Sequence, residues 1–218
     1  MTAFAHIRAW VFDLDNTLYP APALYDAIGV RMTAHIARAL NVDEDEAHRL
    51  RELYFHSHGA TVAGLAQEHG LDASAFLHDV HQVDYSVLKP DPELAALIAA
   101  LPGRRLVFTN GGGGHGQRAL ESLALRGLFE RVFDIESSGI TPKPQRAAYE
   151  RLIAACGIDP RESAIIEDSP RNLEPAHALG FTTALVGEAA AGAKPAYVDY
   201  ASVELKDLLR LALSRETR

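Results

Sequence analysis

The spacing of apolar residues divides the 218-residue chain into stretches of different character. A continuous apolar run over residues 9–12 predicts a buried strand near the N-terminus. Residues 24–88 instead carry apolar side chains at helical spacing, as Ile28, Met32 and Ile36 illustrate, and nothing there predicts a strand. Beyond residue 90, short apolar runs alternate with amphipathic segments.

This alternation predicts strands and helices in turn. The expected strands cover residues 105–108, 132–135, 164–166 and 182–186. The expected helices cover residues 93–100, 115–125, 145–156 (with Pro144 suited to the first turn) and 203–211, and Ser169-Pro170 opens one that stops at Gly180. Such a succession is typical of a parallel sheet with helices on both faces. We therefore expect an α/β fold with a Rossmann-like parallel sheet flanked by helices.

The helical stretch forms an insert after the first strand. Pro20-Ala21-Pro22 breaks the chain before it, and Lys89-Pro90-Asp91-Pro92 ends it. Inside the insert, Asp43 and Glu46 predict a capping box, and residues 75–83 predict a further helix. We expect a core made of residues 1–18 and 90–218, with a small all-helical domain of residues 19–89.

Composition narrows the function. The net charge of -8 argues against nucleic acid polymers, which need Lys and Arg to neutralise phosphates, but it is compatible with a small anionic substrate. The single cysteine, Cys156, lies in an apolar helical pattern and is expected to be a buried thiol in a reducing compartment. The N-terminus lacks a signal pattern and no apolar run approaches a membrane span, so we expect a cytoplasmic protein without a membrane partner.

Two aspartates follow the first predicted strand. Asp13 and Asp15 are separated only by Leu14, and buried carboxylates so close together are costly unless their charge is compensated. A divalent cation with oxygen ligands would compensate it, and an ionised aspartate can act as a nucleophile. The alternative is that Asp15-Asn16 forms a turn and that Asp13 is a half-exposed strand end.

Polar residues also follow two other predicted strands. The three pairs at strand ends are Asp13 and Asp15, Thr109 and Asn110, and Glu167 and Asp168. Because ligands of open parallel sheets bind beyond the carboxyl ends of the strands, we expect these residues to meet at one edge. The carboxylates suit Mg²⁺, and Thr109 and Asn110 suit the oxygens of a phosphoryl group.

Other polar residues have more than one interpretation. Lys143 precedes a predicted helix, where the positive end of the helix dipole disfavours it unless an anion binds there; a solvated surface lysine is the alternative. The glycines at 111–114 predict a flexible turn rather than a P-loop. His115 and Arg118 open the next predicted helix and could face the same edge of the sheet, with a place on the surface as the alternative. The histidines of the insert are expected on solvated helix faces, without a metal among them: His56, His58, His78 and His81.

These residues resemble the ordered motifs of a known family. The motifs Asp13-Leu14-Asp15-Asn16-Thr17, Thr109-Asn110, Lys143-Pro144 and Glu167-Asp168 are similar to those of the haloacid dehalogenase superfamily, and the helical insert resembles its small helical cap. The run from Phe12 to Pro20, and Gly59-Ala60-Thr61 with Gly64-Leu65 in the insert, are similar to the pyrimidine 5'-nucleotidase subgroup. The four consecutive glycines depart from the more varied loop of that family.

The resemblance implies a role for each matching residue. Asp13 would attack phosphorus to form an aspartyl-phosphate, and Asp15 would protonate the leaving oxygen and then activate water. The phosphoryl oxygens would be held by Thr109, Asn110 and Lys143. Mg²⁺ would be bound by Asp13, the backbone carbonyl of Asp15, Asp168 and Glu167, with Asn172 supporting the acidic loop. The cap would close over the site and bring Gly59 and Thr61 to the leaving group.

The implied function is a Mg²⁺-dependent phosphomonoester hydrolase acting on a small phosphorylated metabolite, with pyrimidine nucleoside 5'-monophosphates as the substrates of the subgroup. Four alternatives stay open. They are a phosphatase of another small ester such as a sugar phosphate or phosphoglycolate, a haloacid dehalogenase, a phosphate-sugar mutase and an inactive binding protein.

Overall fold

A parallel sheet forms the centre of the computed structural model, which describes residues 4–20 and 22–214. Its six strands lie in the order β3-β2-β1-β4-β5-β6, and every neighbouring pair is parallel. The strands are β1 (Ala9–Phe12), β2 (Arg104–Phe108), β3 (Arg131–Phe133), β4 (Ser163–Glu167), β5 (Thr182–Val186) and β6 (Tyr200–Ser202). The predicted α/β fold with a Rossmann-like sheet is therefore confirmed. The central position of β1 places its carboxyl end at the point where the strand order reverses.

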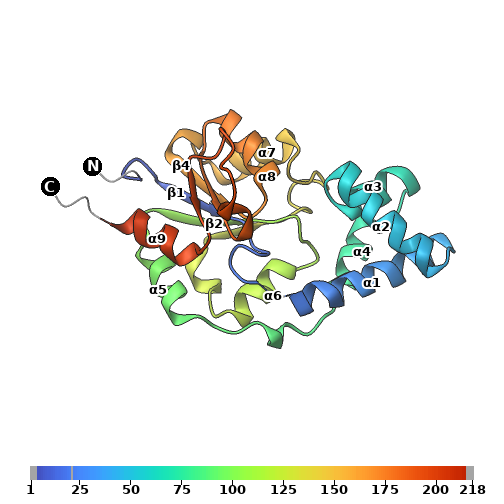
Figure 1. Cartoon of the computed structure of the whole chain (residues 1–218). Coiled ribbons are helices and arrows are strands. Elements are labelled where there is room, and N and C mark those ends of the chain that lie inside the picture. The colour runs from blue at the N-terminus through green and yellow to red at the C-terminus, as the bar shows by residue number, and fades with distance from the viewer. Residues whose placement is uncertain (1–3, 21, 215–218) are drawn as a thin grey trace.

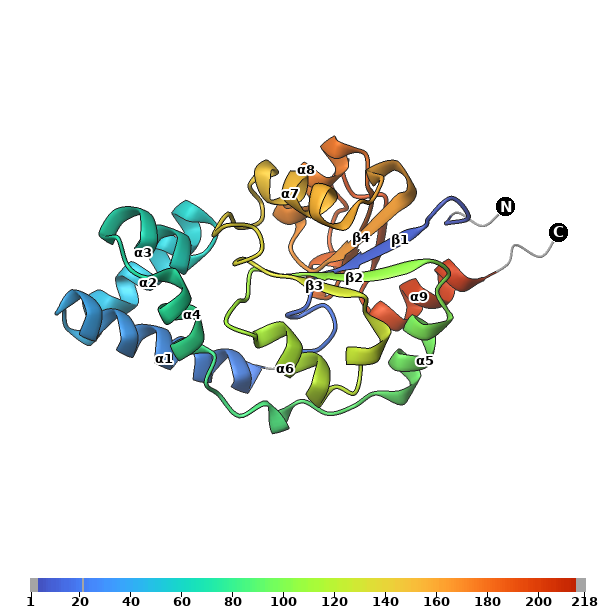
Figure 2. The ribbon, with the colours of Figure 1, turned by 180° about the vertical axis from the view of Figure 1, so that it is seen from behind.

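Helices cover both faces of the sheet (Figures 1 and 2). One face carries α5 (Pro92–Ala100), α6 (His115–Ser122) and α9 (Leu205–Leu213), and the other carries α7 (Arg146–Cys156) and α8 (Pro170–Leu179). Side chains of β1 alternate between the two layers because successive residues of a strand point to opposite faces. Trp10 and Phe12 join the first layer, whereas Ala9 and Val11 join the second. The buried thiol of Cys156 belongs to the second layer, as predicted.

The insert between β1 and β2 is helical throughout its described residues. It contains α1 (Pro22–Leu40), α2 (Glu44–His58), α3 (Thr61–His69) and α4 (Ala73–Val80), followed by the short η1 (Tyr85–Val87). These helices pack around their own apolar cluster, which includes Leu50, Tyr54, Leu65 and Phe76. They lie beside the core at one end of the sheet (Figure 1). None of the described helices is long and apolar enough to cross a membrane.

Several element boundaries differ from prediction for local reasons. The strand β6 was not predicted, because three residues are too few to show a period. Asp72 caps α4 by accepting from the backbone N–H groups of Ser74 and Ala75, so this helix starts at Ala73 rather than at residue 75. It ends at Val80 rather than at residue 83. Asp43 does accept from the N–H of Glu46, but the Glu46 carboxylate pairs with Arg49 instead of completing the capping box.

Further differences concern the prolines. Gln145 is the N-cap of α7, which places Pro144 before the helix rather than in its first turn. Of the predicted break Pro20-Ala21-Pro22, Ala21 lies outside the described residues and Pro22 begins α1. The predicted division into residues 1–18 and 90–218 against 19–89 stays a prediction.

The glycine run packs closely against the insert. Gly113 and Gly114 adopt positive φ values of 56° and 77°, a region that favours glycine. A Cβ atom at Gly113 would lie 2.5 Å from the backbone oxygen of Leu77 in α4, which leaves no room for a side chain. The run therefore brings the core and the insert together, a role that the predicted flexible turn did not include.

Candidate active site

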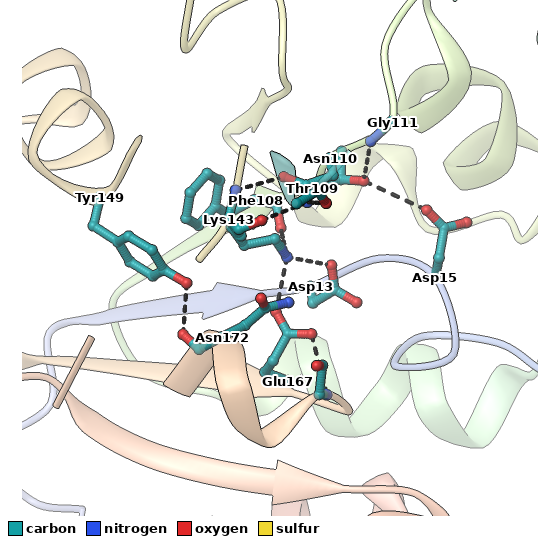
Figure 3. Close-up of polar contacts among 12 residues, drawn as sticks. Asp13, Asp15, Phe108, Thr109, Asn110, Gly111, Lys143, Tyr149, Glu167 and Asn172 are labelled. Carbon is teal, nitrogen blue, oxygen red and sulfur yellow. Dashed lines mark hydrogen bonds and ion pairs between the residues drawn. The ribbon is translucent and has the colours of Figure 1, made fainter. Parts of the chain in front are cut away.

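The polar residues predicted at strand ends meet at one edge of the sheet. Because β1 pairs with both β2 and β4, Phe12 lies beside Val107 on one side and Ile166 on the other. The residues that follow these strands are neighbours for the same reason, and the N–H of Asp13 donates to the carbonyl of Ile166 at 2.9 Å. The structure thus brings together groups from segments that are far apart in the sequence (Figure 3).

Lys143 is the cation at the centre of this edge. Its side chain is only 2% exposed. The Nζ atom donates to Asp13 Oδ1 at 2.6 Å, to Glu167 Oε2 at 2.8 Å and to the backbone oxygen of Phe108 at 2.9 Å (Figure 3). An ammonium has three donors, so all of them are directed at protein acceptors.

The surroundings of Lys143 exclude one of the two interpretations of its sequence position. It is not a solvated surface residue, because it is buried and its charge is compensated by Asp13 and Glu167. The sequence around residue 143 did not predict these two ion pairs, because Asp13 and Glu167 come from strands that are distant in sequence. Asn110 fixes the same segment, since its Oδ1 accepts from the Lys143 N–H at 2.8 Å and its Nδ2 donates to the Lys143 carbonyl at 3.0 Å.

Burial and like charge shift the carboxylates of this cluster. Desolvation, with the charge of Glu167, raises the pKa of Asp13 to about 7 despite the opposing effect of Lys143. Desolvation also raises the pKa of Glu167 and of Asp168. Burial alone would lower the pKa of Lys143, but the charges of Asp13 and Glu167 outweigh it and raise that pKa above its usual value. The ammonium of Lys143 pairs with Asp13 and Glu167, and Asp168 is a third carboxylate nearby, so negative charge is in surplus when all three are ionised.

This surplus fits a divalent cation. Within the described residues, Asp13, Glu167 and Asp168 each offer a carboxylate oxygen, and these atoms lie within 4.8 Å of one another. Both oxygens of Glu167 accept from protein donors, namely Lys143 and, at 3.3 Å, the N–H of Ser169. The second oxygen of Asp13 and the partly exposed Asp168 remain beside the cavity. An all-oxygen set with room for water suits Mg²⁺.

Asp15 occupies a different environment from Asp13. His115 Nε2 lies 2.8 Å from Asp15 Oδ1, and the Tyr19 hydroxyl donates to the same oxygen at 2.5 Å. Thr109 Oγ1 donates to Oδ2 at 3.4 Å (Figure 3). Burial alone would raise the pKa of Asp15, but the charge and hydrogen bond of His115 and the bond from Tyr19 hold it well below its usual range.

His115 lies at the site edge of the sheet, so the alternative of a surface position is wrong. It is buried, its Nδ1 lies 2.8 Å from the Tyr85 hydroxyl, and its ring stacks on His81 at 4.7 Å. Because a carboxylate only accepts, Nε2 must carry the hydrogen shared with Asp15. The expectation of a solvated His81 was also wrong, since this side chain is buried as well. The available signal was that His115 opens the helix directly after β2, at the edge where ligands bind.

Arg118 is likewise not a free surface residue. Its guanidinium donates to the carbonyls of His81 and Gly113 and lies 5.2 Å from the centre of the Tyr85 ring. It therefore ties the glycine run to the end of the insert. Asn172 lies in α8, near the acidic loop. Its backbone carbonyl accepts from the Tyr149 hydroxyl at 2.5 Å (Figure 3).

A cavity of about 1150 Å³ lies between the insert and the strand ends. Both candidate cap residues line it, but their polar groups have partners in the protein. The carbonyl of Gly59 accepts from Asn110 at 3.5 Å, and the hydroxyl of Thr61 donates to the carbonyl of Arg51 at 3.0 Å. At the wall of the cavity, the guanidinium of Arg171 in the core lies 5.1 Å from the ring of Phe55 in the insert.

Comparison with known proteins gives consistent matches. The family model for haloacid dehalogenase-like hydrolases matches residues 7–180. Phosphate metabolism protein 8 of Saccharomyces cerevisiae is 28% identical over 194 residues, which are 80% of this chain and 60% of the yeast protein. The chain thus spans less than two thirds of that relative.

Solved structures share the fold. A HAD phosphatase from Thermococcus onnurineus has a TM-score of 0.65 at 18% identity, covering 94% of this chain and 97% of the other. An L-2-haloacid dehalogenase from Xanthobacter autotrophicus has a TM-score of 0.61 at 20% identity, covering 94% and 98%. At identities of 18% and 20%, these structures show only that the fold is shared.

Replacing Lys143 by Ala should destabilise the protein. Asp13 and Glu167 would be left buried without their counter-charge, which costs about 3–5 kcal/mol when one partner of a buried ion pair is removed. Urea unfolding at pH 8 measures the change in the free energy of unfolding. The matched control is Lys89→Ala, because Lys89 is exposed and, among the described residues, its ammonium donates to the carbonyl of Ser86 alone; its effect should stay within about 0.5 kcal/mol. Equal effects of the two substitutions would contradict this assignment.

A divalent cation should stabilise the protein more at pH 8 than at pH 5. The pKa of Asp13 rises from 3.8 to about 7 on folding, so without a cation the folded state binds more protons and loses stability as the pH rises through this range. Mg²⁺ competes with those protons. At about 100 times its dissociation constant it should add about 2.7 kcal/mol. Scanning calorimetry with and without Mg²⁺, at matched ionic strength, checks this; an equal shift at both pH values would contradict it.

Proposed function

The chain belongs to the haloacid dehalogenase-like hydrolases, and from this premise we propose that it is a Mg²⁺-dependent phosphomonoester hydrolase. One observation carries the proposal. The buried Asp13 has one oxygen held by Lys143, its second oxygen has no hydrogen bond within the described part of the chain, and Asp13 lines the cavity together with Asp168 and Asp15. This arrangement supports a carboxylate nucleophile that is fixed in position and faces the substrate.

In the first step Asp13 attacks phosphorus, and the bond between phosphorus and the ester oxygen breaks. Asp15 gives its proton to that leaving oxygen. The products of this step are the free alcohol and an aspartyl-phosphate on Asp13. In the second step Asp15 takes a proton from water, the resulting hydroxide attacks phosphorus, and the aspartyl-phosphate bond breaks to release inorganic phosphate and restore Asp13.

The pKa shifts of the two aspartates run against these roles until ligands bind. Asp13 and Asp168 would hold Mg²⁺ directly, with Glu167 holding Lys143 in place. Bound there, Mg²⁺ would favour the ionised form of Asp13 and offset charge on the phosphoryl oxygens. The negative charge of the phosphoryl group itself raises the pKa of the adjacent Asp15, which favours the protonated form that the first step requires.

Lys143 and Asn110 contribute by holding the site together. Lys143 orients the nucleophile through its bond to Asp13, and its remaining donors bind Glu167 and Phe108. Asn110 uses both ends of its side chain on the backbone of Lys143. We therefore assign both residues to positioning, and direct contact with the phosphoryl group to other donors.

The haloacid dehalogenase alternative explains fewer of these contacts. Displacement of halide from carbon leaves no alkoxide that needs a proton and no phosphate charge to neutralise. The bonds from His115 and Tyr19 to Asp15, and the acidic cluster around Asp168, would then serve no chemical step. Phosphate ester hydrolysis uses each of them.

The insert of residues 19–89 is proposed as a cap that carries substrate specificity. It lines the cavity from the side opposite the strand ends, and about 1150 Å³ accommodates a nucleotide-sized ligand. The resemblance to the pyrimidine 5'-nucleotidase subgroup favours uridine or cytidine monophosphate as the small phosphorylated partner.

The deciding test is Asp13→Asn with 4-nitrophenyl phosphate and Mg²⁺. Turnover should fall below detection, because an amide is a poor nucleophile toward phosphorus. Asp207→Asn is the matched control, since Asp207 lies on the exposed side of α9 and should leave the rate unchanged. Retained turnover in Asp13→Asn would remove Asp13 as the nucleophile.

A substrate panel separates the remaining functions. Phosphate release is measured from nucleotides, sugar phosphates and phosphoglycolate with and without Mg²⁺. Preference for uridine and cytidine monophosphate would support the nucleotidase, and a flat profile would indicate a general phosphatase. Halide release from a 2-halo acid without metal, interconversion of sugar phosphates without phosphate release, or no turnover at all would each overturn the proposal.

Replacing His115 by Phe should slow the enzyme about ten- to a hundred-fold on alkyl phosphates and less on 4-nitrophenyl phosphate. The variant keeps a ring against His81 but loses the bond that orients Asp15. A poor leaving group needs the proton from Asp15 more than a good one does. The ratio of kcat values for the two esters measures this role, and an equal loss on both would show that His115 is only structural.

A further inference from the structure

The hydroxyl of Tyr25 has no hydrogen-bond partner among the described residues although it is buried. Tyr25 lies in the first turn of α1, the helix with which the insert begins (Figure 1). It lines the same cavity as Asp13, Asp15 and Asp168. A buried hydroxyl without a partner costs free energy, and a ligand that brings an acceptor into the cavity would remove this cost.

Burial and nearby negative charge keep the Tyr25 hydroxyl protonated. Burial raises the pKa of Tyr25, and the charges of Asp15, Asp13 and Asp168 raise it further. The hydroxyl can therefore donate a hydrogen bond. Tyr25 and Asp13 line the same cavity, and the phosphorus of a substrate must lie there beside Asp13 for attack.

The core residues predicted to bind the phosphoryl group already use their side-chain donors within the protein. The three donors of Lys143 point at Asp13, Glu167 and the backbone of Phe108. The side-chain amide of Asn110 is bound to the backbone of Lys143, and the hydroxyl of Thr109 donates to Asp15. Of the unpartnered buried polar atoms among the described residues, the Tyr25 hydroxyl is the donor whose residue lines this cavity, so it can serve a ligand without breaking a bond of the protein.

We propose that Tyr25 donates a hydrogen bond to a nonbridging oxygen of the substrate's phosphoryl group, so that the insert completes the phosphoryl-binding site. This inference rests on the proposed phosphatase function. The nucleophile and the general acid come from the core, and this contact comes from the insert. Binding of the phosphoryl group then couples the position of α1 to the chemistry at Asp13.

The test compares the affinity of inorganic phosphate for the wild type and for Tyr25→Phe. Isothermal titration calorimetry with Mg²⁺ present measures binding without turnover. The variant keeps the ring and loses only the hydroxyl, and it should bind phosphate about tenfold more weakly, as expected for a hydrogen bond to a charged acceptor. Tyr200→Phe is the matched control, because Tyr200 packs its ring on Phe4 in the core and should leave the affinity unchanged.

Kinetics provides a second readout. In Tyr25→Phe the inhibition constant of phosphate and the KM should rise together, while the ratio of rates on alkyl and aryl phosphates stays at the wild-type value. This separates Tyr25 from His115, whose loss should change that ratio. Thermal unfolding that matches the wild type shows that the variant is folded.

The outcomes distinguish a failure of the Tyr25 contact from a failure of the proposed phosphatase function. Equal phosphate affinity of the wild type and Tyr25→Phe, or no phosphate binding by the wild type, would overturn the contact. If the wild type binds phosphate through Tyr25 but hydrolyses no phosphomonoester, the contact stands and the proposed phosphatase function fails.

Discussion

The buried ion cluster around Lys143 is the interaction on which the site depends. One ammonium binds Asp13 and Glu167 at the ends of β1 and β4, and it also binds the carbonyl at the end of β2. These bonds connect three strands at the edge where the order of the sheet reverses. Removing water from so many charges is costly, and the cost is offset only because each donor of the ammonium meets an acceptor. The cluster therefore holds Asp13, the proposed nucleophile, in a fixed position.

The charge of the cluster is also the physical basis for the ligands that we propose. It holds more negative than positive charge, so the carboxylates that are not fully satisfied by Lys143 favour a cation, and a cation favours an anionic phosphoryl group beside it. Asp15 lies two residues from Asp13, but its hydrogen bonds and its pKa are set by different neighbours, His115 and Tyr19. Separate environments thus let two similar side chains take different roles in one reaction.

The insert belongs to the site as much as the core does. Its helices pack around an apolar cluster that also includes Ile135 of the core, and the close approach of Gly113 to Leu77 places the insert against the strand ends. His81 and Tyr85, at its end, support His115 from the side away from Asp15. Changes in the insert can therefore act on proton transfer as well as on the shape of the cavity.

The sequence alone was sufficient for the fold class, most of the strands and helices, and the polar groups at three strand ends. Local periodicity determines the elements, and a parallel sheet has one edge at which strands end, so topology places Asp13, Thr109 and Asp168 together without further information. The short strand β6 and the exact starts of α4 and α7 depended on contacts too local or too brief to show in a pattern.

Tertiary structure alone decided the partners of Lys143 and His115, and left the Tyr25 hydroxyl without one among the described residues. The sequence left open whether Lys143 and His115 lie on the surface and did not single out Tyr25, because burial is set by segments that are distant in sequence. A charge or a hydroxyl becomes chemically active when water is removed from it and a specific partner is supplied or withheld. The order of residues determines which groups reach the edge of the sheet, and packing determines which of them still have an unused hydrogen bond there.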